Sequence, residues 1–225
     1  MEMVPSTDPP LPPVVVCLHG FLRTGASMLP MAYALRRGGY KQFIAPTYLY
    51  QLRRIGQIAD ELARRLAVIA DREGSPVDLV THSYGGLLAR AVMPHAPVRR
   101  VVMLAPPNQG AQVAELARQV IPVHRLGWDP LAEVLPGAPA ALPAGPAEIG
   151  IITGGRPDTD GYNPLLDGDN DFTIRVDEAR LPNARAFRVV EAHHTVIMAN
   201  PTVQRLTLAF LRTGAFPEEG SSGVE

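Results

Sequence analysis

The sequence between residues 77 and 93 constrains the fold of this chain more than any other stretch. Residues 77–80 (Val-Asp-Leu-Val) form an apolar run with the length of a buried strand. Residues 87–93 suit a helix, which Pro94 is expected to end. Ser83 lies between the two, in the sequence His-Ser-Tyr-Gly-Gly, so a strand, a tight turn and a helix meet at this serine. The turn requires small neighbours, and Gly85 meets that need.

Residues 82–86 resemble the nucleophile elbow of α/β-hydrolases, in particular of bacterial lipases and esterases. Thr81 stands where the family usually has a glycine. The resemblance extends to the His19-Gly20 pair, which follows the apolar run 14–18 as it follows the first strand in that family. It implies a catalytic serine, acid and histidine in that order along the chain.

Apolar runs and helical patterns alternate along the whole sequence. Strands are expected at residues 14–18, 43–45, 77–80, 99–104, 149–153 and 186–190, and helices at 27–37, 55–71, 87–93, 111–120 and 201–212. This alternation predicts a doubly wound, mostly parallel sheet of about six strands flanked by helices. The resemblance makes it a compact α/β-hydrolase fold.

The 225 residues are enough for one domain with a sizeable core, so residues 1–225 are interpreted as a single domain. Residues 1–12 are Pro-rich and are predicted to form a loose arm, and residues 217–225 a frayed tail. Residues 111–147 interrupt the alternation and contain a stretch rich in Pro, Ala and Gly. They are predicted to form a cap over the active site, either as a mobile lid or as a packed excursion.

The resemblance also suggests the partners of Ser83. It favours His194 as the base, because this branch commonly reads Ser-His-Thr before an apolar run; His193 stands where the family has serine and is the alternative. Asp171 is the predicted acid, although Phe172 follows it where the family usually has glycine. For that reason the carboxylates at positions 169 and 167 (Asp169 and Asp167) stay open as alternatives.

Two backbone N–H groups are expected to hold the oxyanion that forms when Ser83 attacks a carbonyl. By the resemblance these belong to Tyr84, directly after the serine, and to Phe21, in the loop after the first strand. His19 is interpreted as a structural histidine that hydrogen-bonds this loop. Leu22, Tyr48 and Val196 are candidates for lining an acyl pocket, or else core neighbours of the active-site loops.

A calcium loop is the rival interpretation of the acidic stretch. Asp167, Asp169 and Asp171 have the spacing of EF-hand ligands, and Glu178 falls at the twelfth place of such a loop. The sixth place requires glycine and holds Phe172, and the flanking sequences do not predict two helices. The sequence therefore predicts neither a metal site nor a cofactor.

Composition limits the classes of partner. The formal net charge of −1 argues against a nucleic-acid partner. No apolar stretch is long enough to span a membrane, so stable membrane insertion is not expected.

The start lacks the basic and apolar regions of a signal peptide, which predicts a cytoplasmic protein, or a secreted one whose signal has been removed. The single cysteine, Cys17, is expected to be buried and inert. The sequence predicts no oligomeric state.

These features together predict a serine hydrolase that cleaves carboxylic esters through an acyl-enzyme intermediate. A small-molecule or lipid ester is the expected substrate. A thioesterase or an acyltransferase with the same Ser83-His194-Asp171 set is the alternative. A non-catalytic ligand-binding scaffold is a further alternative, although such a protein often lacks one of the three residues.

Overall fold

A computed structural model of the chain describes residues 11–49, 53–120, 129–156 and 160–218. The predicted N-terminal arm and C-terminal tail lie almost entirely outside these residues. Within them, no helix is long and apolar enough to cross a membrane.

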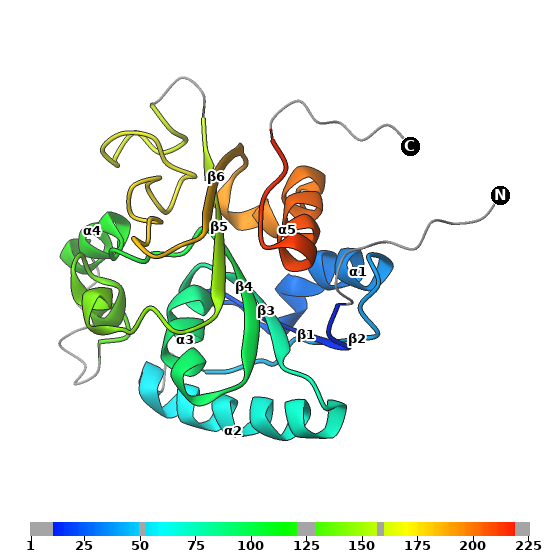
Figure 1. Ribbon diagram of the computed structural model, residues 1–225. Coiled ribbons are helices and arrows are strands. Elements are labelled where there is room, and N and C mark those ends of the chain that lie inside the picture. The colour runs from blue at the N-terminus through cyan, green and yellow to red at the C-terminus, as the bar shows by residue number, and fades with distance from the viewer. Residues whose placement is uncertain (1–10, 50–52, 121–128, 157–159, 219–225) are drawn as a thin grey trace.

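Six parallel strands form one sheet (Figure 1). They are β1 Val14–Leu18, β2 Gln42–Ile44, β3 Val77–His82, β4 Val98–Leu104, β5 Glu148–Gly155 and β6 Ala186–Glu191. Their order in the sheet is β2-β1-β3-β4-β5-β6, and every neighbouring pair is parallel. The predicted six-stranded, doubly wound sheet is confirmed. All carboxyl ends of the strands meet at one edge, where the loops that carry Ser83 and His194 begin.

Both faces of the sheet are buried, which explains why the central strands read as continuous apolar runs. Val14, Val16 and Leu18 of β1 pack in one core with helices α2 (Ile55–Glu73) and α3 (Tyr84–Val92). Val15 and Cys17 pack in the other core with α1 (Leu29–Arg37) and α5 (Pro201–Thr213). Figure 1 shows the sheet between these two helix layers.

The helix after Ser83 begins earlier than the sequence pattern predicted. It starts at Tyr84 rather than at residue 87, so Gly85 and Gly86 belong to its first turn. Glycine is required at position 85 because a Cβ there would lie 2.6 Å from the carbonyl oxygen of Leu18. The α-helix ends at Val92, and Pro94 lies in the 3-10 turn η2 (Met93–His95) that follows.

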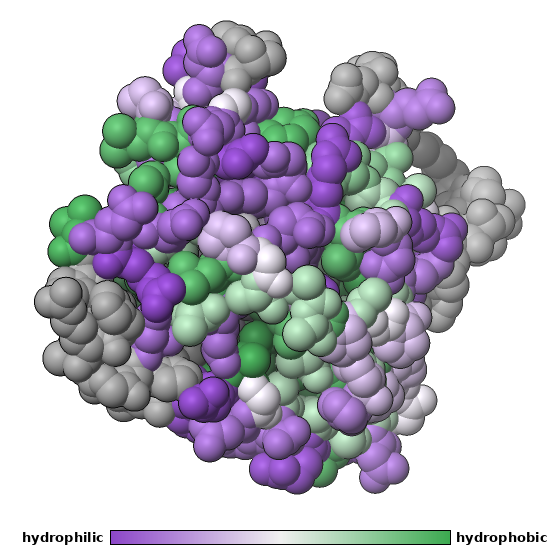
Figure 2. Space-filling view, turned by 90° about the vertical axis from the view of Figure 1, so that its left-hand side faces the viewer, coloured by the Kyte–Doolittle hydropathy of each residue, from purple (hydrophilic) through white to green (hydrophobic). Residues whose placement is uncertain are grey.

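Between β4 and β5 the chain leaves the sheet for the inserted segment, residues 111–147. Its described parts are α4 (Gln112–Val120) and the short 3-10 helices η4 (Ala132–Val134) and η5 (Ala138–Ala141). In Figure 1 it lies beside the sheet on the left, and Figure 2 looks onto this side, where apolar residues are exposed among polar ones.

Buried Arg90 of α3 fixes the inserted segment to the core. Its guanidinium donates hydrogen bonds of 3.1, 3.0 and 2.6 Å to the carbonyl oxygens of Pro143, Pro139 and Leu142. A fourth bond of 3.2 Å reaches the carbonyl of Asn108. Burial lowers the pKa of Arg90, so this cation depends on carbonyl dipoles for its solvation.

Candidate active site

Ser83 sits at the tip of the turn between β3 and α3, in a backbone conformation that side chains rarely adopt. Its φ is +52° and its ψ is −124°. The amide of Ser83 donates a 2.8 Å hydrogen bond to the carbonyl of Leu104, so the neighbouring strand β4 fixes the start of the turn. On the other side Gly20 approaches so closely that a Cβ there would lie 2.9 Å from the Cβ of Ser83. The local sequence therefore produces the strained serine turn that it predicted.

Asp171 and His194 are hydrogen-bonded to each other. The distance from His194 Nδ1 to Asp171 Oδ2 is 2.7 Å, and the amide of His194 donates to the carbonyl of Asp171 at 2.8 Å. Asp171 is fully buried, and its other carboxylate oxygen, Oδ1, accepts the amides of Thr173 at 3.0 Å and Ile174 at 2.7 Å. Both carboxylate oxygens of Asp171 thus take part in hydrogen bonds, and the arrangement favours the tautomer of His194 with its proton on Nδ1 and Nε2 as the acceptor.

His82 connects the serine turn to the loop of His194. Its ring Nε2 donates to the carbonyl oxygen of His194 at 3.1 Å, and the two imidazole rings lie 4.7 Å apart. Burial places the pKa of His82 well below its ordinary value, with a smaller contribution from His194, so this ring is neutral. Ser83 follows His82 directly, so the serine turn is joined through His82 to the loop that carries the hydrogen-bonded pair His194 and Asp171.

The loop that carries Asp171 is organised by two buried asparagines that the sequence analysis did not single out. The side-chain oxygen of Asn170 accepts the amides of Asn163 and Phe172, and its amide group donates to the carbonyls of Asn163 and Gly168. Asn163 in turn donates to the carbonyl of Phe172 at 3.0 Å. Both polar groups of the Phe172 backbone are thus held, at a φ of +92°. Asn-rich loops are common, so composition alone gave no signal for this role.

The alternative acids and the alternative histidine have other partners. Asp169 accepts the amide of Arg156 at 2.7 Å, and Asp167 accepts the side-chain amide of Gln112 at 2.9 Å. His193 packs its ring against Phe172 and Tyr162. The acidic residues of the loop point to different neighbours, and the described residues contain no group of three or more metal-ligating side chains.

The residues expected to hold an oxyanion flank Ser83. Tyr84 is the first residue of α3, where helix amides carry partial positive charge. Phe21 follows Gly20, and its ring lies 6.4 Å from that of Tyr84. His19 is fully buried and hydrogen-bonds within its own loop, as predicted for a structural histidine. Burial lowers its pKa.

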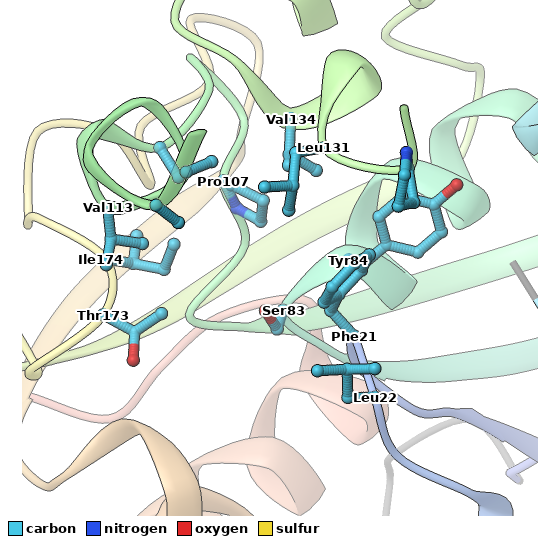
Figure 3. Close-up of a pocket in the computed structure, with 14 residues that line it drawn as sticks. Phe21, Leu22, Ser83, Tyr84, Pro107, Val113, Leu131, Val134, Thr173 and Ile174 are labelled. Carbon is cyan, nitrogen blue, oxygen red and sulfur yellow. The ribbon is translucent and has the colours of Figure 1, made fainter. Parts of the chain in front are cut away.

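An apolar cavity of about 400 Å³ opens above Ser83. Figure 3 shows Phe21 and Tyr84 on one side of the serine, and Thr173 and Ile174 on the other. Leu131 and Val134 of the inserted segment also line the cavity. None of the described residues that line it carries a charge. The cavity therefore favours an uncharged, apolar group next to the hydroxyl of Ser83.

Of the three candidates for lining a pocket, only Leu22 lies in this cavity. Tyr48 instead stacks on His19, with ring centroids 4.0 Å apart, and donates its hydroxyl to the carbonyl of His19. Val196 is 56% exposed and is not part of the lining. For Tyr48 the alternative expectation holds: it is a core neighbour of an active-site loop, because the buried His19 ring offers this tyrosine a flat partner.

Glu133 links the inserted segment to the serine turn, a role with no local sequence signal. Its carboxylate accepts the hydroxyl of Tyr84 at 2.7 Å and the amide of Ile55 at 2.9 Å. Ile55 is the first residue of α2, so the same carboxylate caps that helix. Leu131 and Val134 flank Glu133, and this carboxylate thereby sets the position of one wall of the cavity.

Comparison with known proteins agrees with this architecture. The chain belongs to the alpha/beta hydrolase family, which its sequence matches over residues 15–215. No curated protein sequence matches the chain.

Several solved structures share the fold. The mature form of the Bacillus licheniformis lipase BlEst2 matches with a TM-score of 0.73 and 22% identity, over 94% of this chain and 96% of the lipase. Aspergillus fumigatus lipase B matches with a TM-score of 0.60 and 13% identity, over 88% of this chain and 52% of that protein. Legionella pneumophila phospholipase PlaB matches with a TM-score of 0.52 and 19% identity, over 74% of this chain and 44% of that protein. At these identities the matches show a common fold.

Proposed function

We propose that this chain is a serine hydrolase that cleaves carboxylic esters, with Ser83 as nucleophile, His194 as general base and Asp171 as the acid that orients it. The 2.7 Å hydrogen bond between His194 and a buried Asp171, on a loop joined through His82 to a serine at positive φ, is the observation that carries the proposal. Family membership and the lipase folds among its structural relatives support it.

The mechanism follows from the roles of these groups. Ser83 Oγ attacks the ester carbonyl while Nε2 of His194 takes its proton, and the ionised Asp171 stabilises the resulting imidazolium. The tetrahedral intermediate collapses when the C–O bond to the alcohol breaks and His194 returns the proton to the leaving oxygen. Water then attacks the acyl-enzyme by the same route and frees Ser83. The amides of Tyr84 and Phe21 are the proposed donors to the oxyanion, each of which contributes about 3 kcal/mol in related chemistry.

The cavity above Ser83 is the proposed site of the acyl group. Its lining of Phe21, Leu131 and Val134 gives no partner to a charged or strongly polar acyl chain. The proposed substrate is therefore a small-molecule or lipid ester with an apolar acyl group. We propose that the described part of the inserted segment acts as a fixed roof over it, because Arg90 and Glu133 bind it to the core.

The test is hydrolysis of p-nitrophenyl acetate, butyrate, octanoate and palmitate, with and without EDTA, by the wild type and Ser83→Ala. Turnover by the variant is expected to fall below about a thousandth of wild type, since loss of a nucleophile usually costs at least that much. EDTA is expected to change nothing. A fluorophosphonate should label the wild type and not the variant. Ser75→Ala, which removes a serine from a loop at the other end of β3, is the matched control and should behave as wild type.

Three outcomes contradict parts of the proposal. Activity of Ser83→Ala above about a thousandth of wild type would exclude Ser83 as the nucleophile. Labelling of Ser83 without turnover of any ester would leave the nucleophile in place and point to a thioester or to an acyl acceptor other than water. Absence of both labelling and turnover would favour a binding scaffold.

A further inference from the structure

Three aromatic rings contact one another on the loops that carry Asp171 and His194. The ring of Phe172 lies 5.0 Å from that of His193, with 31° between their planes. The rings of Tyr162 and His193 meet edge-on, with centroids 5.6 Å apart. Tyr162 and His193 are half-buried, whereas Phe172 is 48% exposed. We call Phe172, His193 and Tyr162 the aromatic ledge.

The backbone of Phe172 is strained, and this strain needs a reason. At a φ of +92° a phenylalanine is a steric outlier, and such conformations are energetically unfavourable. Glycine would adopt the same φ without this cost. The buried side chains of Asn170 and Asn163 impose the conformation through the amide and carbonyl of residue 172, so the backbone does not require a phenylalanine. The aromatic ring is therefore the feature that phenylalanine adds at this strained position.

The ledge adjoins both ends of the proposed proton relay. Phe172 follows Asp171, and His193 precedes His194, so the two stacked rings are joined covalently to the acid and the base. Thr173, the next residue after Phe172, lines the cavity above Ser83 (Figure 3). The exposed residue Phe172 therefore stands in the chain between the acid that binds His194 and a residue that lines the cavity.

The proposed chemistry places one part of the substrate at this position. His194 must return its proton to the oxygen of the departing alcohol, so the alcohol lies on the His194 side of the ester bond. In the proposed function the acyl group occupies the apolar cavity above Ser83. We infer that the aromatic ledge binds the alcohol part of the ester and favours flat, aromatic alcohols. This inference rests on the proposed function.

Aromatic contact sets the size of the expected preference. A ring of the substrate that stacks on Phe172 gains the energy of one aromatic pair, which corresponds to roughly a two- to twelve-fold change in kcat/KM. His193 contacts the ring of Phe172 and affects the preference only through that ring. His193 is accordingly a positioning residue in this inference, and Phe172 is the contact surface.

The experiment compares benzyl butyrate with ethyl butyrate, which share an acyl group and have alcohols of similar acidity. Phe172→Gly removes the ring and fits the positive φ, so this variant is expected to fold. We expect its benzyl-to-ethyl ratio of kcat/KM to be two- to twelve-fold lower than that of wild type. The loss should fall on KM for the benzyl ester. His193→Ser should lower the ratio less, and Phe172→Tyr should retain it.

Tyr33→Ala is the matched control. Tyr33 is an exposed aromatic residue on α1 that contacts another ring, Phe43, far from the acidic loop. Its variant should keep the wild-type ratio. If Phe172→Gly lowers turnover of both esters equally, or leaves the ratio unchanged, the ledge is structural and the inference is wrong while the proposed function stands. If the wild type cleaves neither ester, the proposed function itself fails.

Discussion

The two edges of the sheet differ in how their residues affect the stability of the fold. At the carboxyl edge, four described residues other than glycine have positive φ: Leu22, Ser83, Ala105 and Phe172. Each lies in a loop that follows the carboxyl end of a strand, and three of them line or border the proposed active site. Strain of this kind typically costs about 1–3 kcal/mol for each residue.

The amino edge carries satisfied charges in place of strain. Asp78, near the start of β3, is fully buried and accepts two bonds from the guanidinium of Arg99, at 3.0 and 2.6 Å, and one from the hydroxyl of Tyr40. Burial and the neighbouring Asp78 carboxylate raise the pKa of Tyr40, so that hydroxyl keeps its proton. Arg100 pairs with Glu148 at 2.6 Å and also binds the last carbonyls of α5.

This contrast shows how one sheet separates two tasks. A side chain that must meet a substrate is held in a conformation that the loop alone would not adopt, and its cost is offset by packing elsewhere. A buried carboxylate that is paired and hydrogen-bonded within the protein does not need access to solvent, so it fits the edge away from the proposed active site. Changes at the carboxyl edge should therefore cost activity, and changes at the amino edge should cost stability.

Asp171→Asn should have the largest effect on activity of the changes that leave Ser83 in place. The asparagine oxygen can still accept the amides of Thr173 and Ile174, which places its NH₂ group against His194 Nδ1. His194 then carries its proton on Nε2 and cannot take the proton of Ser83. In another serine hydrolase the same change lowers kcat about 10⁴-fold, and we expect a similar loss here. The rate of ester turnover by the variant measures this loss.

Asp169→Asn is the control for this prediction. Asp169 lies on the same loop, but its carboxylate holds the amide of Arg156 rather than His194. The variant should retain turnover within about ten-fold of wild type, because it leaves the His194 tautomer unchanged. A larger loss in Asp169→Asn than in Asp171→Asn would mean that the wrong acid has been assigned.

Asp78→Asn should show the opposite pattern. Removing one charge of a buried pair leaves Arg99 without its carboxylate, which typically costs about 3–5 kcal/mol of unfolding free energy. We expect kcat of the folded fraction at low temperature to stay within two-fold of wild type. Denaturant unfolding and ester turnover measured on the same samples test both statements.

Glu61→Gln is the matched control for Asp78→Asn. Glu61 of α2 also pairs with two arginines, Arg53 and Arg65, but on the surface of the helix. Exposed pairs contribute little, so the melting temperature should change far less than in Asp78→Asn. A large loss of activity in Asp78→Asn without a loss of stability would contradict the division between the two edges.

The carboxyl edge also illustrates what the sequence predicts well. The six strands and the serine turn follow from local patterns: apolar runs of strand length and small residues around Ser83. The choice of His194 and Asp171 followed from the resemblance of their flanking residues to the family's patterns, and the two side chains are hydrogen-bonded in the structure. Phe172 stood as a departure from glycine, and its positive φ shows why glycine is usual there.

Long-range polar contacts were not predictable in the same way. Glu133 reaches Tyr84 and Ile55 across 49 and 78 positions of sequence, and Arg90 reaches Pro143 across 53. Periodic patterns in the sequence do not indicate such contacts, because each contact depends on how two distant segments pack. The start of α3 was missed for a related reason. Glycines disfavour a helix locally, but position 85 requires a glycine because the helix approaches β1 closely there.

His82→Gln should change how stability depends on pH. The ring of His82 is neutral in the folded chain because burial lowers its pKa well below 6.5, whereas the unfolded chain takes up a proton near pH 6.5. Since the unfolded state then binds more protons, stability falls as the pH drops below about 6.5. This single group contributes up to about 1.4 kcal/mol per pH unit, which the variant should lose. Urea unfolding between pH 5 and 7.5 measures the slope.

His95→Gln controls for the loss of an imidazole in general. His95 is exposed in the turn η2, away from the carboxyl edge. If His95→Gln and His82→Gln flatten the pH dependence equally, the burial of His82 is not its cause.

Ser83→Gly should raise stability slightly and thereby measure the strain at the carboxyl edge. Glycine accepts a φ of +52°, whereas alanine keeps the strain of the serine, so Ser83→Gly should be about 1 kcal/mol more stable than Ser83→Ala. Both variants should lack ester turnover. At Ser75, near the amino edge and without positive φ, the order should reverse, because glycine there only adds freedom to the unfolded chain. Equal stability of the two Ser83 variants would mean that the serine turn stores no strain, and the contrast between the edges would then rest on the buried ion pair alone.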